Sequence, residues 1–238
     1  MKKRSMTLAA LGLLLALGLT LTGCDNISAV MGGGKIDAKA YMQGQLDEIY
    51  LGKFDPDYLK MVDATEAAAQ ETYDGGMEAE VEAFNYYFGI EYPTDEYKTR
   101  MLDLYKQAYS KADYTVVSSA EQDDGSYSVK ITVRPLDIIQ LINENYAAFS
   151  EEFEARYADV DVASMSDEEY ATWNETVYDL DYQNGLADLF ESLLPEMGYM
   201  EEKSIAVQIE KGEDDYYSLN SDDFDNLDLL IIDYTDNT

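Results

Sequence analysis

Apolar residues recur at intervals of three and four over the first part of the chain, and this spacing predicts amphipathic helices. The pattern runs through residues 41–50 and resumes after Asp55-Pro56, where an Asp N-cap followed by Pro is typical of a helix start. A longer helix is predicted after Thr65, with Gly75-Gly76 inside it rather than at its end. Another helix is expected to begin after Pro93.

The apolar spacing changes to alternation in two later regions, and alternation predicts strands with one buried face. In the first region, residues 114–117 and 127–133 flank the turn at 123–125, so we expect a hairpin. In the second region, residues 205–209 and 216–219 flank an acidic turn. The two regions share the same order of parts: strand, Asp-rich turn, strand and Leu-Asp pair. Either an ancient duplication or chance would explain this similarity.

Helical spacing returns between and after the hairpins. We expect an amphipathic helix over residues 136–157, a long helical stretch that opens with a capping box at Ser166 and closes at Pro195, and a final helix capped by Ser221. The predicted fold is therefore α+β and mostly helical, with two β-hairpins forming a four-stranded antiparallel sheet packed against helices on one face. A nuclear-transport-factor-two-like arrangement is one candidate, by analogy alone.

The first 23 residues have the layout of a secretory signal peptide. Basic residues at positions 2–4 precede an uncharged, Leu- and Ala-rich stretch over residues 6–22, and small residues close it. An uncleaved transmembrane anchor is the alternative, since the stretch lies at the lower limit of about 17 residues for crossing a bilayer.

The sequence Leu21-Thr22-Gly23-Cys24 resembles the lipobox of bacterial lipoproteins. That resemblance implies cleavage before Cys24 and attachment of acyl chains such as palmitate to its thiol. It favours the signal peptide over the anchor, and it predicts a protein held by lipid on the extracytoplasmic face of the cell membrane. We then expect residues 24–36 to be the lipidated cysteine and a flexible Gly-rich tether, and residues 37–238 to form a single α+β domain.

Composition removes several kinds of chemistry. The chain has no histidine and one cysteine, so Ser-His-Asp and Cys-His catalysis, histidine metal sites and internal disulfides are excluded. The formal charge is −33, and loss of the leader, with three basic residues and no acidic one, takes the mature chain to −36. Such a charge repels nucleic acid, so we expect no nucleic-acid partner. A solvated acidic surface, binding of cationic ligands and a halophile's surface all stay open.

Acidic clusters raise the question of a cation site. The stretch 179–185 resembles the start of an EF-hand loop, but Gly185 and Glu191 each fall one position late, so we expect no such site. Clusters at 213–215 and 222–225 would bind a cation only weakly, and acidic residues are common in turns and at helix starts for local reasons. No metal and no cofactor are therefore predicted.

Carboxylates and tyrosines are the remaining candidates for chemistry. With 49 acidic residues, the sequence singles out no pair for glycoside hydrolysis, so no catalytic residue is predicted. The 21 tyrosines suit a sugar- or peptide-binding surface, and the groups Tyr86-Tyr87-Phe88 and Tyr216-Tyr217 should each expose at least one ring. The spacing of the tyrosines nevertheless favours a place in the core for most of them.

Three segments within residues 41–139 resemble uncharacterised lipoproteins of Gram-positive gut bacteria, namely residues 46–52, 103–107 and 124–129. That resemblance implies no activity and no functional residues. The leading hypothesis is a non-enzymatic binding or envelope-interaction domain, tethered to the membrane through Cys24, whose ligand is a glycan, a peptide or an envelope protein. The alternatives are a carboxylate-based glycan hydrolase, which needs a cleft with two facing acids, and a structural lipoprotein that acts through protein contacts. The oligomeric state is open.

Overall fold

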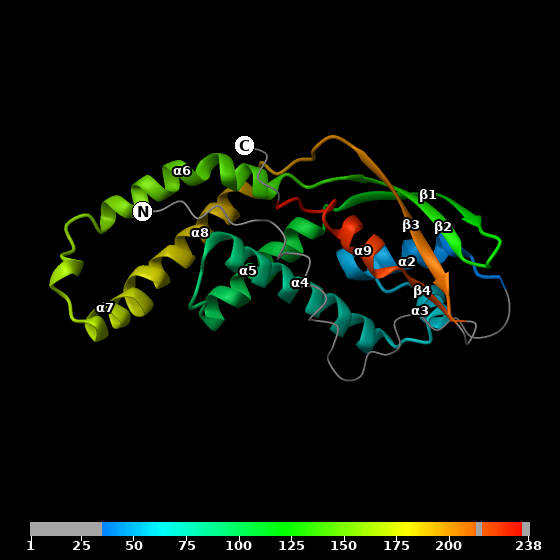
Figure 1. Ribbon diagram of the computed structural model, residues 1–238, viewed down its shortest axis with the longest axis horizontal. Coiled ribbons are helices and arrows are strands. Elements are labelled where there is room, and N and C mark those ends of the chain that lie inside the picture. The colour runs from blue at the N-terminus through cyan, green and yellow to red at the C-terminus, as the bar shows by residue number, and fades with distance from the viewer. Residues whose placement is uncertain (1–34, 213–215, 235–238) are drawn as a thin grey trace.

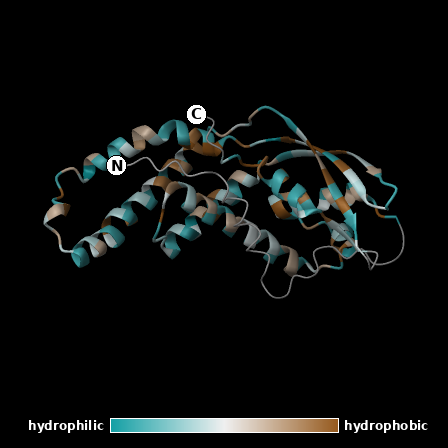
Figure 2. Cartoon of the chain, in the orientation of Figure 1, coloured by the Kyte–Doolittle hydropathy of each residue, from teal (hydrophilic) through white to brown (hydrophobic). Residues whose placement is uncertain are grey.

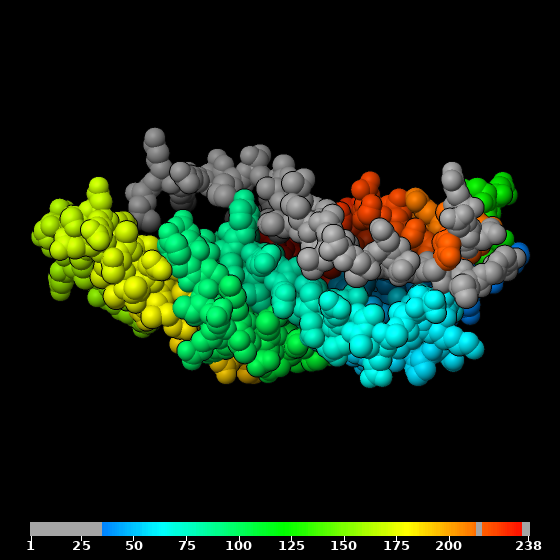
Figure 3. Space-filling view, turned by 90° about the horizontal axis from the view of Figure 1, so that it is seen from below, coloured from blue at the N-terminus to red at the C-terminus, as the bar shows by residue number. Residues whose placement is uncertain are grey.

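The computed structural model describes residues 35–212 and 216–234. The molecule is elongated: a sheet with helices beneath it forms one end, and a pair of helices projects as an arm at the other (Figure 1). The same two ends are seen from below in Figure 3, where the arm is yellow and the helices of the opposite end are cyan.

Four helices form the first half of the fold, and each begins at a short polar N-cap. They are α2 (Ala38–Leu51), α3 (Pro56–Met61), α4 (Glu66–Phe88) and α5 (Asp95–Tyr109). Their caps accept hydrogen bonds from backbone N–H groups that the first turn leaves unpaired, and the cap residues are Asp37, Asp55, Thr65 and Thr94. Gly75 and Gly76 lie inside α4, as predicted.

The four strands form one antiparallel sheet in chain order. They are β1 (Asp113–Glu121), β2 (Tyr127–Arg134), β3 (Lys203–Lys211) and β4 (Tyr217–Leu219). The two predicted hairpins join along β2 and β3, where Val129 pairs with Val207. Val129, Ile131 and Val133 are buried, whereas Lys130 on the other face is exposed. The predicted α+β fold with a four-stranded antiparallel sheet is therefore confirmed, and the likeness to nuclear transport factor two stays a prediction.

Five helical segments lie between β2 and β3. The arm contains α6 (Ile138–Arg156), the short 3-10 helix η2 (Val162–Ser164), α7 (Asp167–Trp173), the π-helix η3 (Asn174–Tyr178) and α8 (Asp179–Leu193). The run from α7 to α8 is unbroken, so it is about 40 Å long at a rise of ~1.5 Å per residue. The predicted capping box is present, with reciprocal hydrogen bonds between Ser166 and Glu169.

The last helix, α9 (Ser221–Asp228), corrects one prediction. Its N-cap is Asn220 and not Ser221. The backbone of Asn220 is extended and its side chain accepts a hydrogen bond from the N–H of Asp223, which makes Ser221 the first helical residue. Asn and Ser are both good N-caps, so their order in the sequence did not decide between them.

The core lies between the sheet and the helices beneath it, and tyrosines form much of it. The strongly hydrophobic colour in Figure 2 gathers in the strands and at the start of α6, while the arm is mostly hydrophilic. Five of the tyrosines are exposed, namely Tyr86, Tyr92, Tyr170, Tyr199 and Tyr216. The others are buried or half-buried, so the prediction that most tyrosines line the core is confirmed, as is the exposure of one ring in each adjacent pair.

Candidate functional site

Aromatic rings hold the two long helices of the arm together. Gly185 of α8 permits their close approach, because a Cβ there would lie 2.8 Å from the ring of Phe149 in α6. Phe149 stacks on Phe153, which is buried and also contacts Tyr182. The Tyr182 hydroxyl donates a hydrogen bond to the carbonyl oxygen of Phe88 at the end of α4. The base of the arm is therefore fixed to the rest of the molecule.

Beyond Phe153 the arm has no core. None of the residues 154–178, which we call the arm tip, is buried. The half-buried rings of Tyr157, Trp173 and Tyr178 contact one another there, with centroids 5.3 to 5.7 Å apart. A segment with so few buried apolar contacts opens at a lower free energy than the body of a protein.

A polar brace ties the arm tip to α8. Arg156 pairs with Asp181 at 3.1 Å, and the Tyr157 hydroxyl donates a hydrogen bond to the same carboxylate at 3.0 Å.

Asp181 belongs to the stretch that resembles an EF-hand loop, and so does Asp179, which accepts a hydrogen bond from the backbone N–H of Tyr92. Across the residues that the structure describes, no three acidic or cysteine side chains gather as a metal site would require.

The π-helix η3 interrupts the middle of the outer helical run. A π-turn contains more residues than an α-turn, so it shifts the angular positions of the side chains on either side of it. Such segments occur frequently at functional sites in proteins. No feature of the apolar spacing predicted this one.

Four apolar side chains of the same run are exposed or half-buried. Tyr170, Trp173, Val177 and Leu180 recur at intervals of three or four along the run, with η3 between Trp173 and Leu180, and the rings of Tyr170 and Trp173 contact each other. Trp173 is half-buried and the other three are exposed. We call these four residues the arm stripe. Exposed apolar side chains that form a continuous patch commonly mark a site of interaction.

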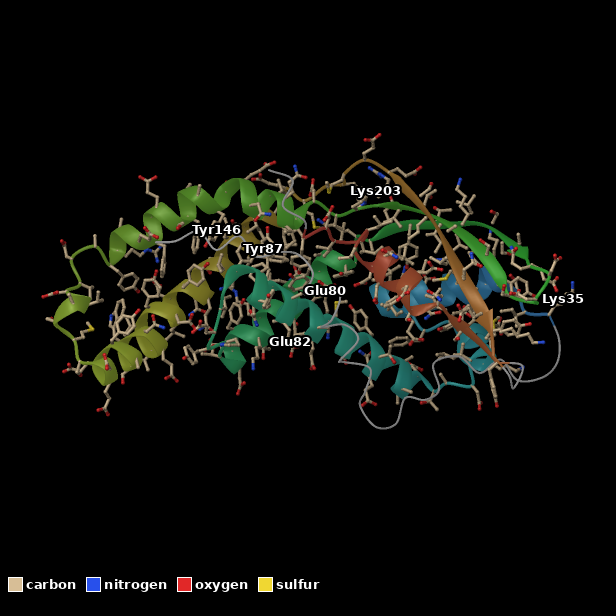
Figure 4. All side chains as sticks on the ribbon, viewed as in Figure 1. Lys35, Glu80, Glu82, Tyr87, Tyr146 and Lys203 are labelled. Atoms are coloured by element: carbon tan, nitrogen blue, oxygen red, sulfur yellow. The ribbon has the colours of Figure 1, made fainter. Side chains whose placement is uncertain are left out.

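A second group of aromatic and acidic side chains lies inside the molecule. The carboxylate of Glu80 in α4 accepts hydrogen bonds from the hydroxyls of Tyr109 at 2.5 Å and Tyr234 at 3.2 Å. The hydroxyls of Tyr234 and Tyr105 are also hydrogen-bonded to each other. Figure 4 shows Glu80 near the middle of the molecule, between the arm and the sheet.

A further buried acid, Asp228 of α9, completes this group. It accepts a hydrogen bond from the Tyr50 hydroxyl at 2.9 Å, and the ring of Tyr50 stacks on that of Tyr109. We call these six residues the acid–tyrosine cluster: Glu80, Asp228, Tyr50, Tyr105, Tyr109 and Tyr234. The helices that supply the cluster come from distant parts of the sequence, so no local motif predicted it.

Burial controls the charge of both acids in the cluster. Desolvation, and to a lesser extent the negative charge of Asp228, raises the pKa of Glu80 to about 8, although the tyrosine hydrogen bonds act in the opposite direction. Desolvation likewise raises the pKa of Asp228 to about 6. Among the described residues, neither carboxyl group forms an ion pair, so no cation offsets the cost of charging them.

The cluster does not have the form of a glycosidase site. Such a site places two carboxyl groups beside a bound sugar. Glu80 and Asp228 are only 8% and 9% exposed, and both are bonded to tyrosine hydroxyls rather than open to a ligand. The geometry fits a polar centre that joins α4, α5, α9 and the C-terminal segment.

A polar hollow of about 370 Å³ lies at the hairpin end of the sheet. It is lined by Asp124, Ser126, Gln208, Glu210 and Lys211. Several of these side chains already bond within the protein: Asp124 accepts from Ser126, and Gln208 donates to the hydroxyl of the neighbouring strand residue Ser128. These hydrogen bonds within the protein account for the polar side chains that line the hollow.

The remaining predicted residues fall into two groups. Asp223, from the acidic cluster at 222–225, accepts a hydrogen bond from the backbone N–H of Gln208 at 2.7 Å, so its role is to join α9 to β3. The cluster at 213–215 lies outside the described residues. The same is true of the lipobox residues Leu21, Thr22 and Gly23 and of Cys24, so the lipidation site stays a prediction.

Comparison with known proteins gives one structural likeness. Neither the protein-family models nor the curated proteins contain a match to this chain. Among solved structures, the chain is similar to a crystal structure from Bacillus subtilis subsp. subtilis str. 168 described as a "putative lipoprotein (ycdA)", with 18% identity and a TM-score of 0.47. The likeness covers 82% of this chain and 56% of that chain, so the present sequence spans little more than half of that protein. Within the described segments, no helix has both the length and the apolar character that crossing a bilayer requires.

Proposed function

We propose that this chain is a lipid-anchored, extracytoplasmic binding protein that contacts a partner protein through the arm stripe. The observation that carries the proposal is an exposed apolar stripe at the end of the molecule opposite the proposed tether. The proposal of a lipid anchor rests on the residues Leu21 to Cys24. The proposal of non-enzymatic binding rests on the arm, where Tyr170, Val177 and Leu180 are exposed.

The position of Lys35 indicates which end of the molecule would lie near the membrane. Lys35 is the first described residue, and it pairs with Glu121 at the far end of the sheet from the arm (Figure 4). Residues 24–35 reach at most about 40 Å at ~3.4 Å per residue. A lipid on Cys24 would therefore hold the sheet end close to the membrane, and the arm tip would extend away from it.

The composition of the arm stripe suits a protein partner. Tyr and Trp supply large contact areas with few rotatable bonds, and they are enriched among the residues that dominate binding energy at protein interfaces. Tyr170 and Trp173 contact each other at 6.2 Å between ring centroids, so they form one surface rather than two isolated rings. Because Trp173 is half-buried, its side chain is already partly immobilised, so binding would cost it less conformational entropy.

The anchor is tested by mass spectrometry of the membrane-bound protein, expressed with its own leader in a bacterium that processes lipoproteins. We expect a mature N-terminus at Cys24 that carries a thioether-linked diacylglycerol. The Cys24→Ala variant should carry no diacylglycerol. A free thiol at Cys24, or a leader still attached to the mature chain, would contradict the anchor.

The arm is tested by placing a photo-crosslinking amino acid at Val177 and, in a matched protein, at Val117 of β1. The two valines are equally exposed, at 43% each, but one belongs to the arm and the other to the sheet, which form opposite ends of the molecule. We expect cross-linking of the anchored protein to one recurring envelope protein from position 177 and not from position 117. Equal cross-linking from both positions would argue against the arm as the contact surface.

The two rival hypotheses remain predictions. The acid–tyrosine cluster does not favour a glycan hydrolase, because Glu80 and Asp228 are buried and bonded to tyrosine hydroxyls. A structural lipoprotein that contacts other copies of itself would show cross-links from Val177 to its own chain, so the same experiment separates it from the proposed function.

A further inference from the structure

We infer that the partner segment bound by the arm stripe is a basic amphipathic peptide segment, in which Lys or Arg side chains flank aliphatic ones. This inference rests on the proposed function and specifies the chemistry of its partner. Two independent properties of the arm tip lead to it: the excess of unpaired negative charge, and the aromatic surface that lies among those charges.

The arm tip carries far more acidic than basic side chains. Its only basic residue is Arg156, which is already paired with Glu152 and Asp181 inside the protein. Within the described chain, none of the acidic residues of the tip forms an ion pair, and these residues are Glu154, Asp159, Asp161, Asp167, Glu168, Glu169 and Glu175. A partner with positive charge is therefore attracted to this end of the molecule.

The aromatic rings of the stripe fit the same partner. Trp and Tyr faces attract ammonium and guanidinium groups, and Trp does so most strongly. Val177 and Leu180 add aliphatic surface for nonpolar side chains of the bound segment. A partner that combines both kinds of side chain would match the stripe and the carboxylates beside it at the same time.

Other classes of partner fit the arm stripe less well. A second copy of this chain would bring one acidic tip against another, and like charges placed in contact oppose association. Nucleic acid and anionic lipid are repelled by the same charge. A neutral apolar partner would remove water from the carboxylates without supplying cations, which costs free energy.

The single tryptophan makes the inference measurable. Trp173 is the only Trp of the chain, so fluorescence excited at wavelengths that tyrosine does not absorb reports on the arm stripe alone. The probe is a peptide of about 18 Leu and Lys residues in helical amphipathic order, added to the detergent-solubilised mature protein. We expect a saturable change in Trp173 fluorescence with micromolar affinity, weakened about tenfold or more between low salt and ~0.5 M NaCl. A Leu and Glu peptide of the same pattern should give no change.

Matched variants distinguish binding at the stripe from unspecific attraction to an acidic protein. Val177→Asp should weaken the Leu and Lys peptide about tenfold although it adds negative charge, because it interrupts the apolar stripe. Val117→Asp adds the same charge at an equally exposed site and should leave the affinity within about twofold. If both variants strengthen binding or leave it unchanged, general electrostatic attraction explains the signal and the inference is wrong.

Neutralising the acids tests the charge directly. The triple variant Asp167→Asn, Glu168→Gln and Glu175→Gln should weaken the peptide about tenfold and flatten its salt dependence. The control triple Glu66→Gln, Glu71→Gln and Glu78→Gln on α4 removes the same charge from exposed positions outside the arm, and it should have less than about a twofold effect. Equal losses in the two triples would overturn the assignment to the arm tip.

The outcomes separate this inference from the proposed function. If cross-linking from Val177 captures one envelope protein but the basic peptide does not bind, the arm is a contact surface and its partner chemistry is different. If the peptide binds but no cross-link forms from Val177 in the anchored protein, the arm accepts basic segments and the proposed function in the envelope fails.

Discussion

The acid–tyrosine cluster and the arm tip contain the same residue types in opposite settings. In the cluster, Glu80 and Asp228 are bonded to tyrosine hydroxyls and cut off from water, which favours their protonated forms. At the arm tip, acidic residues near Tyr170 and Trp173 in the sequence are exposed to solvent. The difference teaches that burial, rather than composition, decides whether tyrosine and carboxylate stabilise the fold or remain available for a partner.

The largest expected effect is the loss of a cluster acid. Glu80→Ala leaves the Tyr109 hydroxyl without its acceptor and opens a cavity, so we expect the free energy of unfolding near pH 6 to fall by about 3 kcal/mol. Urea denaturation measures this change. Glu82→Ala, at an exposed position of the same helix, should cost less than about 0.5 kcal/mol. Similar losses in the two variants would mean that the cluster does not stabilise the protein.

The next effect is a dependence of stability on pH. The pKa of Glu80 is raised from an ordinary value of 4.5 to about 8, so between these values the folded protein holds a proton that the unfolded chain has released. The stability that this proton supplies is full below pH 4.5 and is lost as the pH rises to about 8. We expect the melting temperature to fall from pH 5 to pH 8, and to fall less in Glu80→Gln. An identical slope in both proteins would exclude Glu80 as the cause.

A third change tests packing beneath the sheet. A Cβ at Gly44 in α2 would lie 2.2 Å from the Cγ atom of Tyr58, so Gly44→Ala should reduce the free energy of unfolding by about 2 kcal/mol. Gly76→Ala in α4 meets no atom within 4 Å and should stabilise its helix by up to ~1 kcal/mol. Thermal unfolding of the two proteins should therefore shift in opposite directions, and shifts in the same direction would contradict this description of α2.

A smaller and more local effect is expected in the arm. Gly185→Ala places a Cβ 2.8 Å from the outer part of the Phe149 ring, which can move aside, so we expect a cost of about 1 kcal/mol. Hydrogen exchange should quicken in α6 and α8 while α4 and α5 stay as protected as before. Faster exchange throughout the molecule would show that the arm and the body unfold together.

The smallest effect on stability is expected at the arm stripe. Val177→Asp changes an exposed side chain in a segment without buried residues, so the free energy of unfolding should change by less than about 0.5 kcal/mol. Urea denaturation beside the binding measurement checks this. A large loss of stability would show that the Val177 side chain stabilises the fold, and Val177 would then not belong to the proposed binding surface.

Local sequence rules predicted the elements but not their exposure. The N-caps Asp55 and Thr65, the alternation of β2 and the capping box at Ser166 each depend on neighbouring residues, and each is present. Tyr170, Trp173 and Val177 have the same helical spacing as buried residues such as Leu186. Spacing shows that a helix has an apolar side, but a second element must cover that side before it becomes core.

The candidate sites depended on contacts that no local rule describes. The π-helix η3 has no signature in the apolar spacing, and Asn220 preceded the expected cap by one position. The acid–tyrosine cluster joins Glu80 to Tyr109, Asp228 and Tyr234, which are brought together only when the chain has folded. Among 49 acidic residues and 21 tyrosines, their identities were not distinguishable beforehand.

The bond between Tyr234 and Glu80 spans 154 positions of the chain and has a consequence for export. Until Tyr234 arrives, Glu80 and Tyr105 each lack one of their native hydrogen-bond partners. A polypeptide that is still passing through a secretion pore therefore lacks the contacts that close its interior, and native contacts of such long range form slowly. If the predicted leader directs export, the hydrogen bonds of Tyr234 to Glu80 and Tyr105 form only after residue 234 has crossed the membrane.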